Sequence, residues 1–474
     1  MKSISLIKSG FWITYATFLT RFFALLSNLI LARLLLPSDF GVIGIAYVFW
    51  SFFTLFTQGT AGSFIMCKGT EDKRYLNTAY TVSLCIGITF ALAMIASSPA
   101  IANWFKEPNL TGLLIIFACN LVLSSIFYVY YGIMTRQMQY RELANINFLS
   151  CMTRLISTTG SALLGLGYWS FAIGDTASWV IGCIMTRYKS GHNLRLEINP
   201  EVRAEVISFC LGATGSSFGF YLNANMDNLV VGKLLGNASL GYYNLAYQIT
   251  MSFSLIFNSV VNQLGMPVFA QISDEKQQEE TLFRVVEEMS FIIAPIYALL
   301  FLIIDKPLIA FVFGSQWTPM SIVIPWLLIF AYFRVINSPL DSMLSAKGRP
   351  DLNARVNIYI APIAVVAFII GSQYGGILGV SIAVAFVLGI VWTTAWWWVG
   401  CRQFNWSLAK FFKITFQAII FIVPSLFISS FFPFLLKPIV FSCVYILSLK
   451  LLLPKQFLKY QEITDKVVRW LKEK

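Results

Sequence analysis

The sequence has little charge for its length. Only 12% of its 474 residues are Asp, Glu, Lys or Arg, about half the share that is usual in a soluble domain. Hydrophobic residues make up 57% of the chain, and the mean hydropathy is +0.72. A water-soluble fold cannot cover that much apolar surface, so we expect an all-α polytopic membrane protein. The same high apolar share excludes a disordered chain and a fibrous protein. A soluble nucleic-acid binder is also excluded, because in a membrane protein a net charge of +12 is typical of topology signals.

Residues that carry much of enzyme chemistry are also scarce. His192 is the single histidine and lies in a polar loop, which argues against a Ser-His-Asp triad and a histidine metal site. The eight cysteines form no CxxC pair, so neither a disulfide framework nor a thiolate metal site is expected. No Walker A or GxGxxG nucleotide loop is present. We therefore predict no catalytic residue, no metal, no cofactor and no enzymatic activity.

Long apolar runs predict about fourteen transmembrane helices. A bilayer core of ~30 Å needs about 20 helical residues. The N-terminal run lacks a small-residue cleavage site, and we interpret it as the first span rather than a leader. The predicted spans are 10–32, 41–65, 77–98, 110–132, 144–166, 168–188, 204–226, 240–265, 286–304, 319–342, 354–371, 376–399, 411–431 and 434–453.

Basic residues orient these spans. With the N-terminus inside, the loops predicted to be cytoplasmic hold 26 of the 34 Lys and Arg residues, and the external loops hold five. This asymmetry follows the positive-inside rule and predicts that both termini are cytoplasmic. Tryptophans near the predicted span ends are typical of membrane-interface anchors; they are Trp104, Trp169, Trp317, Trp396, Trp397, Trp398 and Trp406.

An internal repeat occurs at an offset of 200 residues. Segments 28–47 and 228–247 are identical at seven of twenty positions, including Asn28/Asn228 and Gly41/Gly241. Six spans separate the copies, so both start on the same side and the halves should be parallel repeats. The predicted organisation is a six-helix lobe over 1–188, a cytoplasmic loop over 189–203, a second six-helix lobe over 204–400, two further helices over 401–453 and a basic tail over 454–474. The tail is either an interfacial helix or an ordinary basic segment that sets topology.

Three arginines lie within predicted spans. A central arginine costs ~2.5–3.5 kcal/mol on insertion scales, so Arg21, Arg154 and Arg334 need a wet cavity or partners. One interpretation is a cationic cavity that binds an anionic substrate. The other is that Asp175 and Asp341 pair with Arg154 and Arg334, as structural or coupling ion pairs. Arg21 has no obvious acidic partner in the sequence, which makes it the first candidate for substrate binding.

A polar stripe surrounds Arg21 on the first span. Spacings of four, three and four residues place Thr17, Arg21, Ala24 and Asn28 on one helical face. The corresponding second-half positions are Ser217, Tyr221 and Asn228, so tyrosine replaces the arginine. Matching polar spans are expected to line a binding site between repeats. Close packing of two helices is the alternative explanation.

The segment from Ala32 to Gly41, ARLLLPSDFG, resembles a known family, and Gly10, Trp12 and Arg21 add to the likeness. It is similar to Wzx-type oligosaccharide-lipid flippases of the colanic-acid-exporter-like branch, within the multidrug/oligosaccharidyl-lipid/polysaccharide exporter superfamily. The resemblance implies a V-shaped fold of two lobes in the bacterial inner membrane. It also implies alternating access that moves undecaprenyl-diphosphate-linked repeat units from the cytoplasmic to the outer leaflet for surface polysaccharide biosynthesis. The polysaccharide polymerase machinery would be a further partner.

Two other functions stay open at this stage. An organic-cation antiporter of the same superfamily should have unpaired carboxylates in its cavity, whereas the central charge here is positive. A membrane glycan polymerase or ligase would need catalytic groups in sizeable external loops. The predicted external loops are short and carry few such groups.

Overall fold

The computed structural model describes residues 2–57, 60–272, 274–349, 351–454 and 457–458, and every element in these ranges is helical. The elements are α1 Lys2–Leu34, α2 Pro37–Thr57, α3 Thr60–Lys68, α4 Lys73–Phe105, α5 Leu110–Arg136, α6 Tyr140–Leu163, α7 Trp169–Ser190, α8 Arg203–Leu235, α9 Asn237–Gln271, α10 Glu275–Ile303, α11 Lys306–Val312, the 3-10 helix η1 Ser315–Ile322, α12 Ile324–Ile336, α13 Ser338–Ala346, α14 Asp351–Ala383, the π-helix η2 Val384–Val391, α15 Trp392–Gln403, α16 Leu408–Ser430 and α17 Lys437–Leu452.

All fourteen predicted segments overlap these helices, but only some are strongly apolar. Within the described residues, eight helical stretches are long and apolar enough to cross a membrane. Helices α6, α7, α8, α9 and α17 are not among the eight, so the count of fourteen spans stays a prediction. The predicted break between segments 354–371 and 376–399 falls at a kink at Gly376, whose positive φ of 56° suits glycine, and the second helix continues through η2.

Short-range chemistry sets several helix starts. Asp72 precedes α4, and its carboxylate accepts a hydrogen bond from the backbone N–H of Arg74 at 2.8 Å. This cap satisfies one of the free donors at the helix start, and hydrogen bonds from the Arg74 side chain and backbone lower the pKa of Asp72. Asp274 and Asp305 cap α10 and α11 in the same way.

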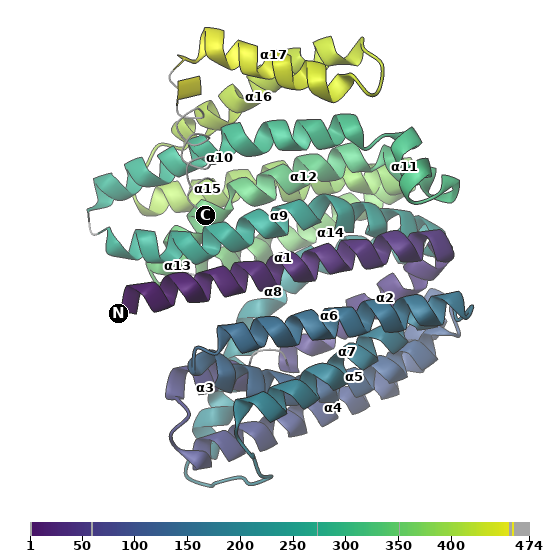
Figure 1. The fold of residues 1–474 in the computed structure, drawn as a ribbon, viewed down its shortest axis with the longest axis vertical. Coiled ribbons are helices and arrows are strands. Elements are labelled where there is room, and N and C mark those ends of the chain that lie inside the picture. Colours follow the sequence, from purple (N-terminus) through teal and green to yellow (C-terminus); the bar gives the residue numbers. More distant parts are fainter. Residues whose placement is uncertain (1, 58–59, 273, 350, 455–456, 459–474) are drawn as a thin grey trace.

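Corresponding helices of the two halves pack in the same order. In the first half, α1 packs on α6, α2 on α5, and α7 on both α5 and α6. In the second half, α8 packs on α14, α9 on α12 and α13, and η2 on both α12 and α14. Figure 1 shows α2 to α7 as one group and α9 to α15 as another, with α1 running between them against α6 and α9, and with α16 and α17 beyond α10. The shared order supports the division into two repeats, which stays a proposal.

The two halves meet reciprocally at a pair of glycines. A side chain on Gly41 would overlap the backbone carbonyl of Asn237, and one on Gly241 would overlap that of Pro37. Both glycines lie five positions into equivalent helices, α2 and α9, and each faces the first residue of the other. Small residues allow such close backbone approach in membranes. The offset of 200 residues in the sequence therefore corresponds to a two-fold-like contact in space.

Further contacts close the ends of the helices that we predict to be external. Arg33 Nε donates to the carbonyl of Val312 at 2.7 Å, and the buried Trp317 donates its Nε1–H to the carbonyl of Ala32 at 2.7 Å. Lys233 donates to the carbonyl of Trp104. We call these contacts, together with Gly41 and Gly241, the outer seal. It joins the first half to the second.

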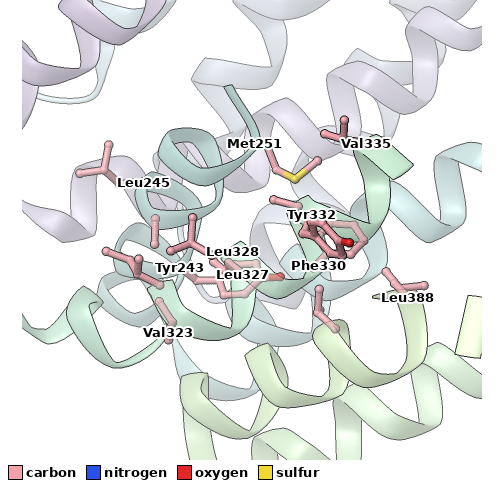
Figure 2. Packing of buried hydrophobic residues seen from close by; sticks show 14 of the residues in the cluster. Tyr243, Leu245, Met251, Val323, Leu327, Leu328, Phe330, Tyr332, Val335 and Leu388 are labelled. Carbon is pink, nitrogen blue, oxygen red and sulfur yellow. The ribbon is translucent and has the colours of Figure 1, made fainter. Parts of the chain in front are cut away.

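Several tryptophans predicted to be interface anchors belong instead to the core. Trp317, Trp396 and Trp397 are each at most 1% exposed. Trp397 stacks on Phe411 with ring centroids 4.1 Å apart. Figure 2 shows the neighbouring packing, where side chains of α9 and α12 interdigitate with Leu388 of η2. These tryptophans sit near helix ends, but other helices cover them, so the anchor prediction is wrong for them.

The loop between the halves is held against α4. Asn77 donates its amide to Glu197 at 3.1 Å and accepts a hydrogen bond from the backbone N–H of Arg195 at 3.1 Å. Thr81 and Thr78 bond the backbone of the same loop at Glu197 and Asn199. The loop is thus an extended segment with specific anchors on the first half.

Candidate functional site

The three predicted arginines each line a different cavity. Arg21 lines a cavity of about 210 Å³ between α1, α5 and α6. Arg154 lines one of about 240 Å³ between α2, α5, α6 and α7. Arg334 lines one of about 30 Å³ formed mainly by α8, α9, α12 and α14.

The Arg21 cavity is polar and aromatic. Thr17 and Thr20 of α1 line it, together with Tyr131 of α5 and with Tyr140 and Asn147 of α6. Arg21 is half-buried and forms no ion pair with any residue that the structure describes.

A second cation stands near this cavity. The Arg141 guanidinium lies 5.8 Å from the ring centre of Trp12, which also lines the cavity. A half-buried guanidinium with neighbouring hydroxyl and amide groups suits a phosphate oxyanion.

Arg154 is part of a compact polar triad. Its Nε donates to Asp175 Oδ1 at 2.5 Å, and its Nη2 donates to the hydroxyl of Tyr47 at 3.0 Å. Tyr47 in turn donates to Asp175 Oδ2 at 2.6 Å. The predicted pairing of Arg154 with Asp175 is therefore present, and it neutralises much of the charge of Arg154.

Arg334 has a different environment. Its guanidinium lies 6.0 Å from the ring centre of Trp392. Asp341 accepts a hydrogen bond from Asn353 at 2.9 Å, and Asn353 accepts one from Asn357 at 2.5 Å. Asp341 therefore lies in a network of amide side chains, and its pairing with Arg334 and its coupling role stay predictions.

Two other residues of the polar stripes, Asn28 and Tyr221, form hydrogen bonds between the halves. Asn28 donates to Gln248 of α9 at 2.6 Å, and the buried Tyr221 donates to the carbonyl of Val48 in α2 at 3.1 Å. Asn228 donates its backbone N–H to Asp227. Ser217 lies on α8, but its side chain is outside the part of the structure that is described. Close packing thus accounts for Tyr221, while Thr17 and Arg21 line the cavity together.

Sequence reasoning missed two buried polar residues. Asp227 is 1% exposed and accepts a hydrogen bond from Tyr243 at 2.6 Å. Asn120 is also 1% exposed and lines the Arg154 cavity. No local pattern marks Asn120, because an asparagine in an apolar run gives no sign of the face on which it lies.

The described residues contain no group of three or more His, Cys, Asp or Glu side chains that could hold a metal ion. All eight cysteines are free. The arrangement offers cationic and hydrogen-bonding cavities inside a membrane-length helical bundle. Such cavities can bind and release a polar group that would otherwise face hydrocarbon.

Sequence comparison identifies a family and its relatives. The family described as polysaccharide biosynthesis protein matches residues 30–322. The lipopolysaccharide biosynthesis protein WzxC of Escherichia coli (strain K12) is 24% identical over 380 residues, which cover 78% of this chain and 76% of that protein. The teichuronic acid biosynthesis protein TuaB of Bacillus subtilis (strain 168) is 25% identical over 376 residues, covering 75% and 72%.

Solved structures share the fold. The lipid II flippase MurJ in an inward closed conformation superposes with a TM-score of 0.73 at 16% identity, covering 91% of this chain and 96% of that one. An inward-facing multidrug resistance transporter of the MATE family gives a TM-score of 0.63 at 15% identity, covering 85% and 98%. The chain therefore has the fold of these membrane transporters, as an all-α multi-pass membrane protein.

Proposed function

The chain belongs to the polysaccharide biosynthesis protein family, and from this premise we propose that it is a flippase for lipid-linked oligosaccharides. Its substrate would be an undecaprenyl-diphosphate-linked repeat unit, carried from the cytoplasmic to the outer leaflet of the bacterial inner membrane. The names of the relatives and the fold shared with a lipid II flippase support this proposal. The observation that carries it is Arg21, a half-buried cation in a polar cavity of a membrane-length helix.

The diphosphate is the part of such a lipid that most opposes passage through hydrocarbon. Transfer of an ion from water into hydrocarbon costs more free energy than a single contact with the protein can offset. The diphosphate therefore needs a cation that binds it within the membrane. Arg21 offers paired, directional donors, and Thr17 and Asn147 beside it offer further hydrogen bonds. The polyprenyl tail would remain in lipid beside the protein.

Transport would proceed by alternating access between the lobes 1–188 and 204–400. The outer seal closes the ends near Arg33 and Lys233, so this state is closed at the face that we predict to be external. Release outside would require the outer seal to part, and the cavity that Arg21 lines would then become accessible from the outer leaflet.

An organic-cation antiporter is less well supported. It needs a carboxylate available to the cation, whereas Asp175 is paired with Arg154, and Asp227 and Asp341 each accept a hydrogen bond from a neighbour. We also propose that the chain acts as a transporter rather than an enzyme, and that it delivers its product to a polysaccharide polymerase.

The test is glycan export in cells whose own copy is deleted. Arg21→Ala should abolish surface polysaccharide while the protein still inserts in the membrane, and Arg21→Lys should restore it partly, because lysine keeps the charge but loses the paired donors. Arg136→Ala is the matched control, since Arg136 of α5 does not line the Arg21 cavity and donates to the backbone carbonyl of Met66. Full export by Arg21→Ala would rule out this site.

A further inference from the structure

The cavity beside Arg154 is lined by polar atoms that have no hydrogen-bond partner, in addition to those of the Arg154–Asp175–Tyr47 triad. Asn120 is 1% exposed and lines it, yet neither its amide oxygen nor its amide nitrogen has a hydrogen-bond partner. The Nε1–H of Trp50, which also lines it, has none either. Buried polar atoms without partners are costly and rare in a folded protein, so this cavity is built to hold something polar.

The second half provides an internal comparison. Tyr247 stands at the repeat position of Tyr47 and lines the small Arg334 cavity. There the amide of Asn357 is satisfied, because Trp392 Nε1 donates to it at 3.0 Å and Asn223 donates to it at 2.7 Å. That cavity measures about 30 Å³, against about 240 Å³ in the first half. The Oδ1 atom of Asn223 has no partner in the smaller cavity. The smaller cavity nevertheless leaves little room beyond its own side chains, whereas the larger one leaves room for a ligand.

The chemistry of the larger cavity selects a neutral, hydroxyl-rich ligand. The carboxylate of Asp175 disfavours an anion, and the guanidinium of Arg154 disfavours a cation. Amide, indole N–H and the hydroxyl of Ser178 offer both donors and acceptors. Aromatic walls complete it, with Trp50 and Trp179 ring centroids 6.1 Å apart and Phe117 stacked on Tyr47 at 5.4 Å. Apolar faces with a few placed polar groups are the usual lining of a small-molecule site.

Size and access agree with one sugar ring. A volume of about 240 Å³ is that of about eight water molecules at the liquid share of ~30 Å³ each. The hydroxyls of a bound ring would replace such waters. The side chain of Arg154 is 30% exposed and that of Asp175 is 13% exposed, so the cavity is not sealed.

The cavity also lies within reach of the Arg21 site. Asn147 of the Arg21 cavity and Arg154 of the larger cavity are both on α6, seven residues apart. Seven residues are two turns, so these side chains share one face of α6 and lie about 10 Å apart along its axis. A sugar attached directly to a diphosphate held at Arg21 would reach this distance.

We propose that the cavity lined by Asn120, Trp50 and Trp179 is a carbohydrate subsite, which takes the pyranose ring next to the diphosphate of the lipid-linked substrate. This assignment rests on the proposed function and deepens it. It places the diphosphate at Arg21 and the first sugar between α2, α5, α6 and α7.

The test is direct sugar binding to the purified full chain in detergent, followed by saturation-transfer NMR. The probes are methyl glycosides of glucose, galactose and N-acetylglucosamine. At least one should bind saturably with a dissociation constant in the millimolar range, as befits a ligand of this size. Asn120→Leu should weaken that binding about tenfold or more, since it removes both amide contacts. Its melting temperature should be unchanged or higher, because it also removes two unsatisfied buried atoms.

Asn337→Leu is the matched control. Asn337 is a buried amide of the second half whose partners are Thr393 at 2.8 Å and Trp397 at 3.0 Å. Its replacement should lower the melting temperature and leave sugar binding as it is in the wild type.

Three outcomes would overturn the subsite. They are the absence of saturable binding of every probe, equal binding by Asn120→Leu and the wild type, and binding of tetraphenylphosphonium that Asn120→Leu or Asp175→Asn removes. If the wild-type protein still translocates lipid-linked glycan in any of these cases, the subsite fails alone and the proposed function stands. Wild-type protein that does not translocate such a lipid contradicts the proposed function, whatever the sugar binding.

Discussion

Replacement of Asp175 by leucine tests how the Arg154 triad is balanced. Asp175 accepts hydrogen bonds from Arg154 at 2.5 Å and from Tyr47 at 2.6 Å, and its side chain is 13% exposed. Removing it leaves a guanidinium and a hydroxyl without their acceptor. Loss of one partner of a buried ion pair costs about 3–5 kcal/mol. Because the Arg154 side chain is 30% exposed, we expect a smaller loss of about 2–3 kcal/mol in the free energy of unfolding.

The double variant Arg154→Met/Asp175→Leu separates charge from packing. It removes both ions and places apolar side chains of similar size in a membrane interior, so its cost should be smaller than that of Asp175→Leu alone. We expect the two changes to be non-additive by at least about 1 kcal/mol.

The assay is equilibrium unfolding of the purified variants in mixed micelles, followed by tryptophan fluorescence and arranged as a double-mutant cycle. Arg33→Ala serves as an arginine control whose partner is a backbone carbonyl. Additive costs, or an Asp175→Leu variant as stable as the wild type, would refute the view that this pair is a coupled unit within the fold.

Other contacts give further tests. Gly41→Ala should weaken the outer seal, because a methyl group would overlap the carbonyl of Asn237, and Gly241→Ala should do the same from the other side. The measurement is the labelling rate of a single cysteine placed just inside the outer seal of an otherwise cysteine-free protein. The rate should rise in both variants, and an unchanged rate would contradict the prediction. Asn77→Ala should free the loop between the halves by removing two hydrogen bonds, and trypsin should then cleave at Arg195 faster by on the order of tenfold; an unchanged cleavage rate would show that the anchor is dispensable.

The sequence predicted the helical architecture well, for a physical reason. Apolar runs of about 20 residues have few alternatives to membrane helices, so each predicted span falls on a helix. The predicted repeat includes Gly41 and Gly241, which meet the same steric demand where α2 and α9 cross. The break that the apolar pattern predicted between residues 371 and 376 falls at the kink at Gly376, where the backbone has a positive φ.

The site was harder to predict than the fold. Hydropathy gives the depth of an arginine in the membrane, but not the direction in which it points, so the separate cavities of Arg21, Arg154 and Arg334 could not be foreseen. The pairing of Arg154 with Asp175 was accessible because both lie in adjacent spans. The burial of Asp227 was not predicted, because its hydrogen-bond partner Tyr243 lies on another helix. The substrate roles of these residues remain predictions.

Translocation by the purified protein tests the central claim most directly. Proteoliposomes would carry a polyprenyl-diphosphate-linked oligosaccharide, and a membrane-impermeant glycan reagent would report the leaflet in which it lies. Wild-type protein should move the lipid between leaflets, and Arg21→Ala should reduce the rate to that of protein-free vesicles. If the wild-type rate equals the rate in protein-free vesicles, the chain is not a flippase for this class of lipid. Undiminished transport by Arg21→Ala would show that Arg21 is not the group that receives the diphosphate.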